Sequence, residues 1–377
     1  MNKELLVSPE AENKPRIDFI WTLDRICAWN CPFCCVDALY VHKKGSEILV
    51  QSNGNNLSFP FQKGEGDLYT QAAKNLIQRR LALSTDEKLR ILDNLSGVNP
   101  RIDFSGGDLL LLPENLEVIK RASELFGRGN IGITTTGVGM ERGQVADYLD
   151  YISEVEFTYD QTDEYDYRQT GYNSSNLAAA MKLQSEGVKT RALIPLTQSN
   201  STPEAIRKIY IALHSAGVDS ILLMRVFPVG RGASSSPQPL GKEEYLRLIQ
   251  EYQALEGIYG APRVKLQCAL KYLFPANLSD NPCGFLSSSL GISDRGQLIA
   301  SAWAYDQNGQ IISPEFVIGD LKVSKIGDLI SQERIQSLIS RKDENFGHCK
   351  IFAYLNESRK QGVDRLFAKA DPLYLSG

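Results

Sequence analysis

Histidine is scarce in this chain, with three among 377 residues, and its scarcity narrows the metal chemistry that the chain can support. Structural zinc sites take four ligands, usually paired cysteines or cysteines with histidines. The chain also lacks any run of the roughly 18 apolar residues that a membrane helix needs. Its first residues, MNKELLVSPEAENKPRIDF, contain no apolar signal-peptide core. We therefore expect a cytoplasmic protein that is not embedded in a membrane.

Long runs of lysine and arginine are missing as well. The chain has 41 basic and 45 acidic side chains and a formal net charge of −4. Because a nucleic-acid-binding protein usually carries a basic face, no nucleic-acid partner is expected. Hydrophobic residues make up 42% of the chain and charged residues 23%, which is ordinary for a globular protein. The length predicts two domains, or one barrel with an appendage.

Four of the seven cysteines lie within residues 27–35, CAWNCPFCC. Cys27, Cys31 and Cys34 follow the spacing C-x3-C-x2-C, and Cys35 comes directly after them. In a reducing compartment, clustered cysteines are more often metal ligands or redox groups than disulfides. Zinc would need a fourth ligand, and only His42 lies nearby. Three thiolates leave one iron of a [4Fe–4S] cube open, so we predict an iron–sulfur cluster, with zinc or a chance grouping as the alternatives.

The rest of the chain alternates between apolar, β-branched runs and amphipathic runs, as in a parallel sheet with crossover helices. Ser84 and Glu87 form a capping box that begins one helix, and Gly97 ends it. Predicted strands cover residues 16–23, 101–108, 131–137, 154–160, 189–196 and 219–232. Predicted helices cover residues 84–97, 113–127, 176–187, 202–217 and 242–252. Polar and glycine-rich segments follow the strands, as in an α/β barrel whose site lies at the carboxyl edge.

The cysteine loop, with Phe33 before its last ligand, resembles the signature of the radical S-adenosylmethionine (SAM) enzymes, and the six βα units resemble their partial (β/α)6 TIM-type barrel. The resemblance implies that Cys27, Cys31 and Cys34 hold the cluster, that Cys35 does not, and that Phe33 lies against the adenine of SAM. In this family the reduced cluster cleaves SAM to methionine and a 5′-deoxyadenosyl radical, which abstracts hydrogen from substrate. The electron comes from a donor such as flavodoxin or ferredoxin.

Further segments resemble the SAM-contacting positions of this family. The SGGD turn stands where the family has Gly-Gly-Glu-Pro, with aspartate for glutamate and Leu109 for proline; the alternative is a plain strand-to-helix turn. Arg168 is expected at the SAM carboxylate, because a guanidinium fork suits two carboxylate oxygens, unless it is an exposed loop residue. The full set of implied contacts is Phe33, Ser105, Gly106, Gly107, Asp108, Thr134, Thr136, Thr158, Asp160 and Arg168.

Two segments around the barrel have open interpretations. The VFPVGRG segment after the sixth strand either lines the adenine or turns the chain. Residues 40–83 form an insertion much longer than most connections, and they are either a substrate lid or partner-docking hairpin, or a solvated excursion. The expected organisation is an N-terminal tail at 1–15, a barrel with this insertion at 16–232, and a C-terminal domain at 233–377.

The C-terminal part resembles the SPASM/twitch domain, a small α+β appendage that holds auxiliary [4Fe–4S] clusters in many radical SAM enzymes. CGFLSSSLGISDRGQLIAS reads like its hairpin, but Ser301, Phe352 and Tyr374 stand where ligands belong. The domain is therefore predicted to be degenerate. Its three cysteines, Cys268, Cys283 and Cys349, either hold one auxiliary cluster, if they converge, or are inert buried residues. His348 is a candidate fourth ligand or a solvated side chain.

The resemblance predicts that the enzyme uses SAM to make a radical, but it predicts the substrate less closely. We expect an enzyme that modifies a ribosomally synthesised peptide, by a crosslink, a thioether, epimerisation or backbone excision. The peptide would be delivered by a separate recognition protein or would dock on residues 40–83. One alternative is a dehydrogenase or epimerase of small molecules such as aminosugars. An alternative of another class is a metal-binding module without catalysis.

Overall fold

The computed structural model describes residues 14–141, 144–160, 172–235, 240–274, 278, 280–286 and 288–374. Arg168 lies outside these residues, so its predicted role stays a prediction. Within the described residues the central feature is a ten-stranded sheet with the order β11-β10-β9-β8-β7-β6-β1-β12-β13-β14. A second sheet has the order β2-β3-β4-β5. None of the described helices combines the length and apolar character that crossing a membrane requires.

Six parallel strands in chain order form the barrel, and each coincides with a predicted strand. They are β1 (Arg16–Asp24), β6 (Asn99–Gly106), β7 (Ile131–Thr135), β8 (Glu154–Thr158), β9 (Lys189–Leu196) and β10 (Ser220–Arg225). A further strand, β11 (Arg263–Leu266), adds parallel to β10. The predicted α/β fold class, a partial TIM-type barrel, is confirmed.

The crossover helices are also where the sequence predicts them. They are α2 (Thr85–Asn94), α3 (Asn115–Phe126), α5 (Tyr172–Ser185), α6 (Pro203–Ser215) and α8 (Lys242–Tyr259), with the short α4 (Val138–Glu141) after β7. The capping box of α2 is present, with Glu87 N donating to Ser84 Oγ at 3.3 Å and Ser84 N donating to Glu87 Oε2 at 2.9 Å. Helix α8 extends beyond its predicted end at residue 252, and Gly260, in the left-handed conformation, ends it.

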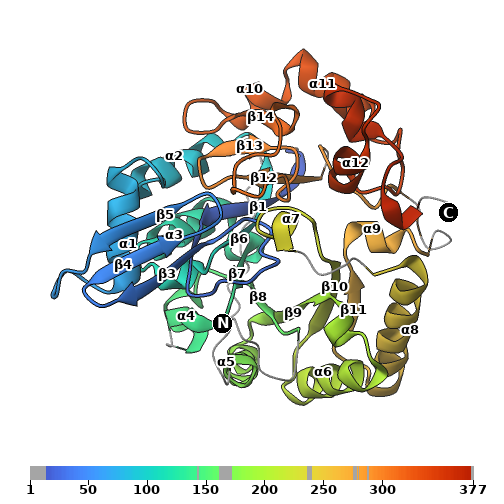
Figure 1. Ribbon diagram of the computed structural model, residues 1–377, viewed down its shortest axis with the longest axis horizontal. Helices are drawn as coiled ribbons and strands as arrows, with labels where there is room; N and C mark the ends of the chain where they lie inside the picture. The colour runs from blue at the N-terminus through green and yellow to red at the C-terminus, as the bar shows by residue number, and fades with distance from the viewer. Residues whose placement is uncertain are drawn as a thin grey trace, which may run out of the picture.

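The barrel strands bury one face against these helices. Along β1 and β6 every second side chain is apolar and buried, and the rings of Trp21 and Phe104 lie 5.4 Å apart. Figure 1 shows α5, α6 and α8 on one side of the molecule and the C-terminal helices α11 and α12 on the other. The opposite face of the strands is the inner face of the open barrel, and it carries charged side chains.

The insertion is a folded unit, so the prediction of a solvated excursion is wrong. Its strands β3 (Leu39–Lys44), β4 (Glu47–Gln51) and β5 (Asn56–Pro60) form an antiparallel meander, and β2 (Ile26–Cys27) joins the meander to the cysteine loop. Helix α1 (Leu68–Gln78) covers it, and Val41, Ile48, Val50 and Phe59 pack with Leu76 in a separate hydrophobic core. A role as a lid or docking hairpin stays a prediction.

The predicted C-terminal hairpin is present, and it extends the barrel sheet. Strand β12 (Ser289–Ile292) pairs in parallel with β1 and antiparallel with β13 (Gln297–Ile299), which pairs with β14 (Val317–Asp320). One hydrophobic core includes Ile17 of the barrel and Leu366 near the C-terminus. The remaining helices are α7 (Gly232–Ser235), α9 (Cys268–Lys271), α10 (Ile326–Ile330), α11 (Glu333–Ser340) and α12 (Lys350–Asn356). The domain boundary near residue 232 stays a prediction.

Candidate functional site

The cysteine loop leaves the carboxyl end of β1, at the edge of the barrel where an α/β active site is expected. The loop turns at Cys34, whose N–H donates to Cys31 O at 3.2 Å. Two backbone N–H groups already point at thiol sulfurs: Trp29 N lies 3.4 Å from Cys27 Sγ, and Ala38 N lies 3.3 Å from Cys34 Sγ. None of the seven cysteines forms a disulfide.

The donors of this loop suit an iron–sulfur cluster, whose ligands are mainly cysteine thiolates. Burial raises the pKa of the Cys27 thiol well above its usual range, and the neighbouring Cys31 raises it further. A bound cation would offset that cost by favouring the thiolate. No three cysteine, histidine or carboxylate side chains in the described part of the chain converge on one metal ion. Hydrogen bonds from backbone N–H groups to sulfur also tune the potential of such clusters. The ligand assignment stays a prediction.

The two glycines of the SGGD turn have a role that sequence reasoning did not anticipate. A side chain on Gly106, whose φ is +130°, would lie 2.0 Å from Asp24 O, and one on Gly107 would lie 1.9 Å from Ile26 O. Gly107 N donates to Asp24 O at 3.0 Å, and Asp108 N donates to Ile26 O at 2.8 Å. The side of each glycine where a side chain would stand is therefore occupied by the backbone that leads into Cys27, and the predicted SAM contacts of this turn stay predictions. The turn fixes the start of the cysteine loop.

Asp108 is fully buried and joins the ends of two strands. Its carboxylate accepts hydrogen bonds from Thr135 Oγ1 at 2.7 Å and Thr136 Oγ1 at 2.5 Å, and from the N–H groups of Leu110 and Gly139. Burial raises its pKa, and the two threonines oppose that rise. Because both oxygens already accept these bonds, Asp108 supports the site from within, and its predicted contact with the SAM amino group stays a prediction. Sequence reasoning did not predict the contact of Thr135 with Asp108.

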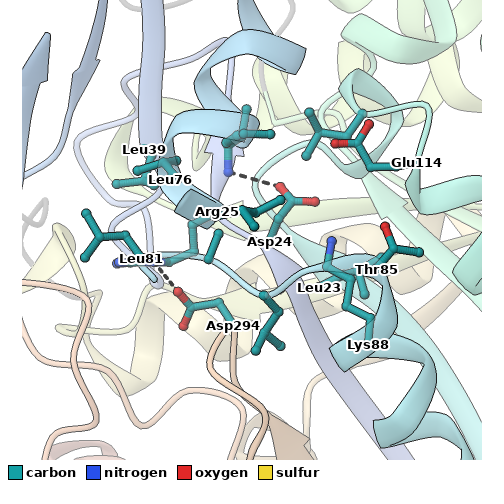
Figure 2. Close-up of a pocket in the computed structure, with 16 residues that line it drawn as sticks. Leu23, Asp24, Arg25, Leu39, Leu76, Leu81, Thr85, Lys88, Glu114 and Asp294 are labelled. Atoms are coloured by element: carbon teal, nitrogen blue, oxygen red, sulfur yellow. Dashed lines mark hydrogen bonds and ion pairs between the residues drawn. The ribbon is translucent and has the colours of Figure 1, made fainter. Parts of the chain in front are cut away.

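A second buried carboxylate supports the loop from behind. Asp24 accepts from Ile26 N at 3.0 Å and from Asn115 Nδ2 at 2.8 Å, and Lys88 Nζ donates to Asn115 Oδ1 at 2.8 Å. Figure 2 shows Asp24, Lys88 and Glu114 around one small pocket. Burial raises the pKa of Asp24 and lowers that of Lys88. The sequence signal for Lys88 was its place one turn before Leu92, on the apolar face of α2.

Thr134 belongs to a charged network on the inner face of the barrel. Its hydroxyl lies 3.1 Å from both carboxylate oxygens of Asp103 and 3.4 Å from Glu156 Oε2. Arg191 pairs with Glu156 and, at 2.5 Å, with Glu154, which also pairs with Arg101. The structure thus separates Thr134 from Thr136, which binds Asp108. The network was readable from the alternating polar residues of RIDFS and EVEFT, but sequence reasoning used neither pattern.

The other predicted SAM contacts lie around the same edge. Thr158 O accepts from Asn176 Nδ2 at 3.1 Å, and Asp160 O accepts from Asn200 Nδ2 at 3.0 Å, so two asparagines fix the end of β8. Ser105 pairs in register with Thr22 of β1, and Phe33 is half-buried in the cysteine loop. Their contacts with SAM stay predictions.

Cys268 and Cys283 are in contact and Cys349 lies near them, but the three, all within the described residues, do not converge on one metal ion. The thiols of Cys268 and Cys283 share a hydrogen bond, which raises the pKa of Cys268 and lowers that of Cys283 to about 6. Cys349 is close enough to raise the pKa of Cys268. His348 is buried, and its Nδ1 has no hydrogen-bond partner among the described residues. Tyr374 packs edge-on against His348, with ring centroids 5.5 Å apart. An auxiliary cluster here stays a prediction.

Several solved structures resemble this chain. A scan against protein-family models and a search of curated proteins found no match. SuiB from Streptococcus suis bound to its precursor peptide SuiA has 12% identity and a TM-score of 0.60, covering 86% of this chain and 67% of SuiB. SuiB bound to S-adenosylmethionine has 13% identity and a TM-score of 0.54, covering 76% of this chain and 60% of SuiB.

The chain thus spans about two thirds of SuiB or less. At this level of identity the likeness concerns the fold. SuiB is a radical SAM enzyme, and the match covers most of this chain. The chain therefore has the fold of the radical SAM enzymes, as its cysteine loop and βα order predict.

Proposed function

We propose that this chain is a radical SAM enzyme that reductively cleaves S-adenosylmethionine at a [4Fe–4S] cluster on Cys27, Cys31 and Cys34. The observation that carries the proposal is the position of the cysteine loop. It leaves the barrel at the carboxyl edge of β1, and the SGGD turn of β6 is hydrogen-bonded to its base. The cluster would supply one electron to SAM, and the resulting radical would remove a hydrogen atom from substrate. A flavodoxin or ferredoxin would supply the electron.

In this proposal the chain's own residues hold SAM and keep water from the reaction. The SGGD turn and Arg168 bind the amino and carboxylate groups of SAM, and Phe33 packs against its adenine. Thr136, Thr158 and Asp160 border the remainder of the molecule. Asp108 orients Thr136, because their hydrogen bond fixes the threonine rotamer. The site needs reduced thiols, so we place the enzyme in the cytoplasm.

The proposed substrate is a ribosomally synthesised peptide. Support comes from SuiB, the structural neighbour that was solved with its precursor peptide. The inner face of the barrel offers charged side chains from β6, β8 and β9, which suit a polar substrate better than a lipid. The peptide would reach the barrel through a separate recognition protein or by docking on the insertion at residues 40–83.

The test is anaerobic reconstitution with iron and sulfide, followed by an assay for 5′-deoxyadenosine with SAM and a reductant. We expect about four irons per chain, or about eight if an auxiliary cluster is present. Cys31→Ala should abolish 5′-deoxyadenosine formation, whereas the matched control Cys35→Ala should keep both iron and activity. Iron uptake without any 5′-deoxyadenosine would favour a metal-binding module and refute the proposal. Loss of the cluster in Cys35→Ala would refute the ligand assignment.

A further inference from the structure

Arg231, in the VFPVGRG segment after β10, binds the cysteine loop. Its backbone N–H donates to Cys34 O at 2.8 Å, and its Nη1 donates to Cys31 O at 2.9 Å. Nη2 donates to Ala38 O, and Nε donates to Asp37 Oδ1 at 3.2 Å. The Arg231 side chain is 8% exposed. One arginine therefore binds the loop at Cys31, at Cys34 and beyond its last cysteine.

The preceding glycine closes onto the same loop. Gly230 has a φ of +54°, and a side chain there would lie 2.4 Å from the carbonyl carbon of Cys35 and 2.5 Å from Cys34 O. Its N–H donates to Tyr305 O at 3.1 Å, in the C-terminal part of the chain. The close approach to the loop thus depends on Gly230, where a side chain would not fit, and on Arg231, which forms the hydrogen bonds. The VFPVGRG segment therefore lies against the cysteine loop, and a contact with the adenine stays a prediction.

Asp37 extends the contact to the insertion. It is fully buried, and its φ of 47° is unusual for a residue other than glycine. Besides Arg231, its carboxylate accepts from Asn53 N at 3.1 Å and Gly54 N at 3.2 Å, in the turn between β4 and β5. A side chain on Gly54 would lie 2.4 Å from Asn308 O, so the C-terminal part of the chain packs behind this turn.

A second arginine holds the same stretch from the other side. Arg25 Nη1 lies 3.3 Å from Val36 O and 3.4 Å from Asp37 O, and its Nε donates to Asp294 Oδ2 at 2.9 Å. Figure 2 shows the Arg25–Asp294 pair, in which Asp294 follows β12. The end of the cysteine loop is therefore fixed by the barrel, the insertion and the C-terminal hairpin together.

Stability alone explains these contacts poorly. A buried ion pair gains little net free energy, because removing both charges from water costs about as much as their attraction returns. Its better-supported use is to select one geometry. Here the arginine donates to backbone carbonyls of the loop at three positions, which fixes the path of the backbone between the cysteines. Outer contacts of this kind orient metal ligands and tune the metal.

We propose that Arg231 is a positioning residue that, with Asp37, holds the cysteine loop in its cluster-binding conformation before the cluster is inserted. The inference rests on the proposed function. Two consequences follow. In the metal-free protein the loop is already ordered, so its thiols react slowly with alkylating reagents. In the loaded protein the guanidinium adds positive charge beside Cys31, which favours the reduced cluster, since net charge and hydrogen bonding set the reduction potential.

The first test measures the rate at which iodoacetamide alkylates Cys31 and Cys34 in the metal-free protein. Losing a hydrogen bond to a charged group costs about 1.5–3 kcal/mol, so Arg231→Met should speed alkylation at least about tenfold. The matched control is Arg225→Met, which removes a buried arginine from an aspartate elsewhere. It should change the rate less than about twofold. Equal acceleration by both variants would reduce Arg231 to a general structural role and overturn the proposal.

The second test measures the reduction potential of the reconstituted cluster by electron paramagnetic resonance. Arg231→Met should shift the potential to a more negative value, and Arg231→Lys, which keeps the charge but loses the fork, should shift it less. If Arg231→Met does not fold, the alkylation rates of Arg231→Lys and of the isosteric Asp37→Asn test the proposal in its place. If the alkylation rate is unchanged in variants that fold, the proposed positioning role of Arg231 is overturned. If the wild-type protein takes up no iron, the proposed function is refuted instead. The alkylation rates of the metal-free protein then still test the positioning role of Arg231.

Discussion

The buried pair Arg225–Asp371 ties the end of β10 to the C-terminal DPLY segment, and its removal gives a measurable prediction. The contact is bidentate, with Nη1–Oδ2 at 2.8 Å and Nη2–Oδ1 at 2.9 Å, and the two side chains are 4% and 0% exposed. The guanidinium carbon lies 3.7 Å from the ring centroid of Phe352. Asp371 also accepts from Cys349 N and Leu373 N. Solvent therefore screens this pair very little.

Asp371→Ala should lower the free energy of unfolding by about 3–5 kcal/mol. Two charge-assisted hydrogen bonds at about 1.5–3 kcal/mol each give a similar sum. Most of the loss arises because the guanidinium of Arg225 stays buried without its partner. Replacing both residues, as in Arg225→Met with Asp371→Leu, should therefore recover that part of the stability, while the N–H groups of Cys349 and Leu373 still lose their acceptor. The assay is urea unfolding of the metal-free protein.

The control is Asp364→Ala, which removes a carboxylate that pairs with Arg341 at 2.9 Å but is 59% exposed. An exposed pair contributes about 0–1 kcal/mol, so this variant should unfold almost as the wild type does. A loss below about 1 kcal/mol for Asp371→Ala would refute the argument. So would a double variant no more stable than the single one, because the penalty would then not come from the unpaired charge.

Three further predictions concern the site. Arg168→Ala should weaken SAM binding at least about tenfold without changing the iron content; an unchanged dissociation constant would mean that another residue binds the carboxylate. A variant in which Cys27, Cys31 and Cys34 are all replaced by alanine should retain at most about four irons, and about eight would contradict a degenerate appendage. Burial and the nearby Glu156 hold the pKa of Asp103 well above its usual range. The folded protein therefore binds the carboxyl proton more tightly than the unfolded chain does, and it loses stability as pH rises above about 4. Asp103→Asn should therefore be more stable than wild type at pH 7 and should flatten the pH dependence of urea unfolding. Identical plots of unfolding free energy against pH for the two proteins would refute this prediction.

The barrel was readable from the sequence because its signals are local. Each strand is a short apolar run that ends in polar or glycine-rich residues, and the capping box of α2 needs only Ser84 and Glu87. The sheet of the insertion was missed, although KGS and NGN mark its two turns. Its strands are short, and their apolar residues gain a core only by packing on α1. The pairing of β12 with β1 joins Asp18 to Ser289, and no local pattern encodes it.

The same distinction holds for the site. The cysteine spacing is local and points to a cluster from one stretch of nine residues. The environment of Asp108 depends on Thr135 at the end of β7 and on Gly139 in α4, so its hydrogen bonds could not be predicted before these elements were placed. Arg231 binds Cys31 O, which lies 200 positions earlier in the chain. Residue types in such motifs are therefore predictable, whereas the direction in which a side chain points depends on contacts between distant segments.

The parallel pairing of β12 with β1 also bears on how the protein is made. Strand β1 leaves the ribosome early, and β6 covers one of its edges soon afterwards. Its other edge waits for β12, which at about 5–20 residues per second is roughly a quarter of a minute to a minute later. During that interval a strand containing Phe19 and Trp21 has an unpaired edge, which is a template for aggregation. We therefore expect the nascent chain to depend on chaperones until β12 emerges, and truncations before residue 289 to be prone to aggregation.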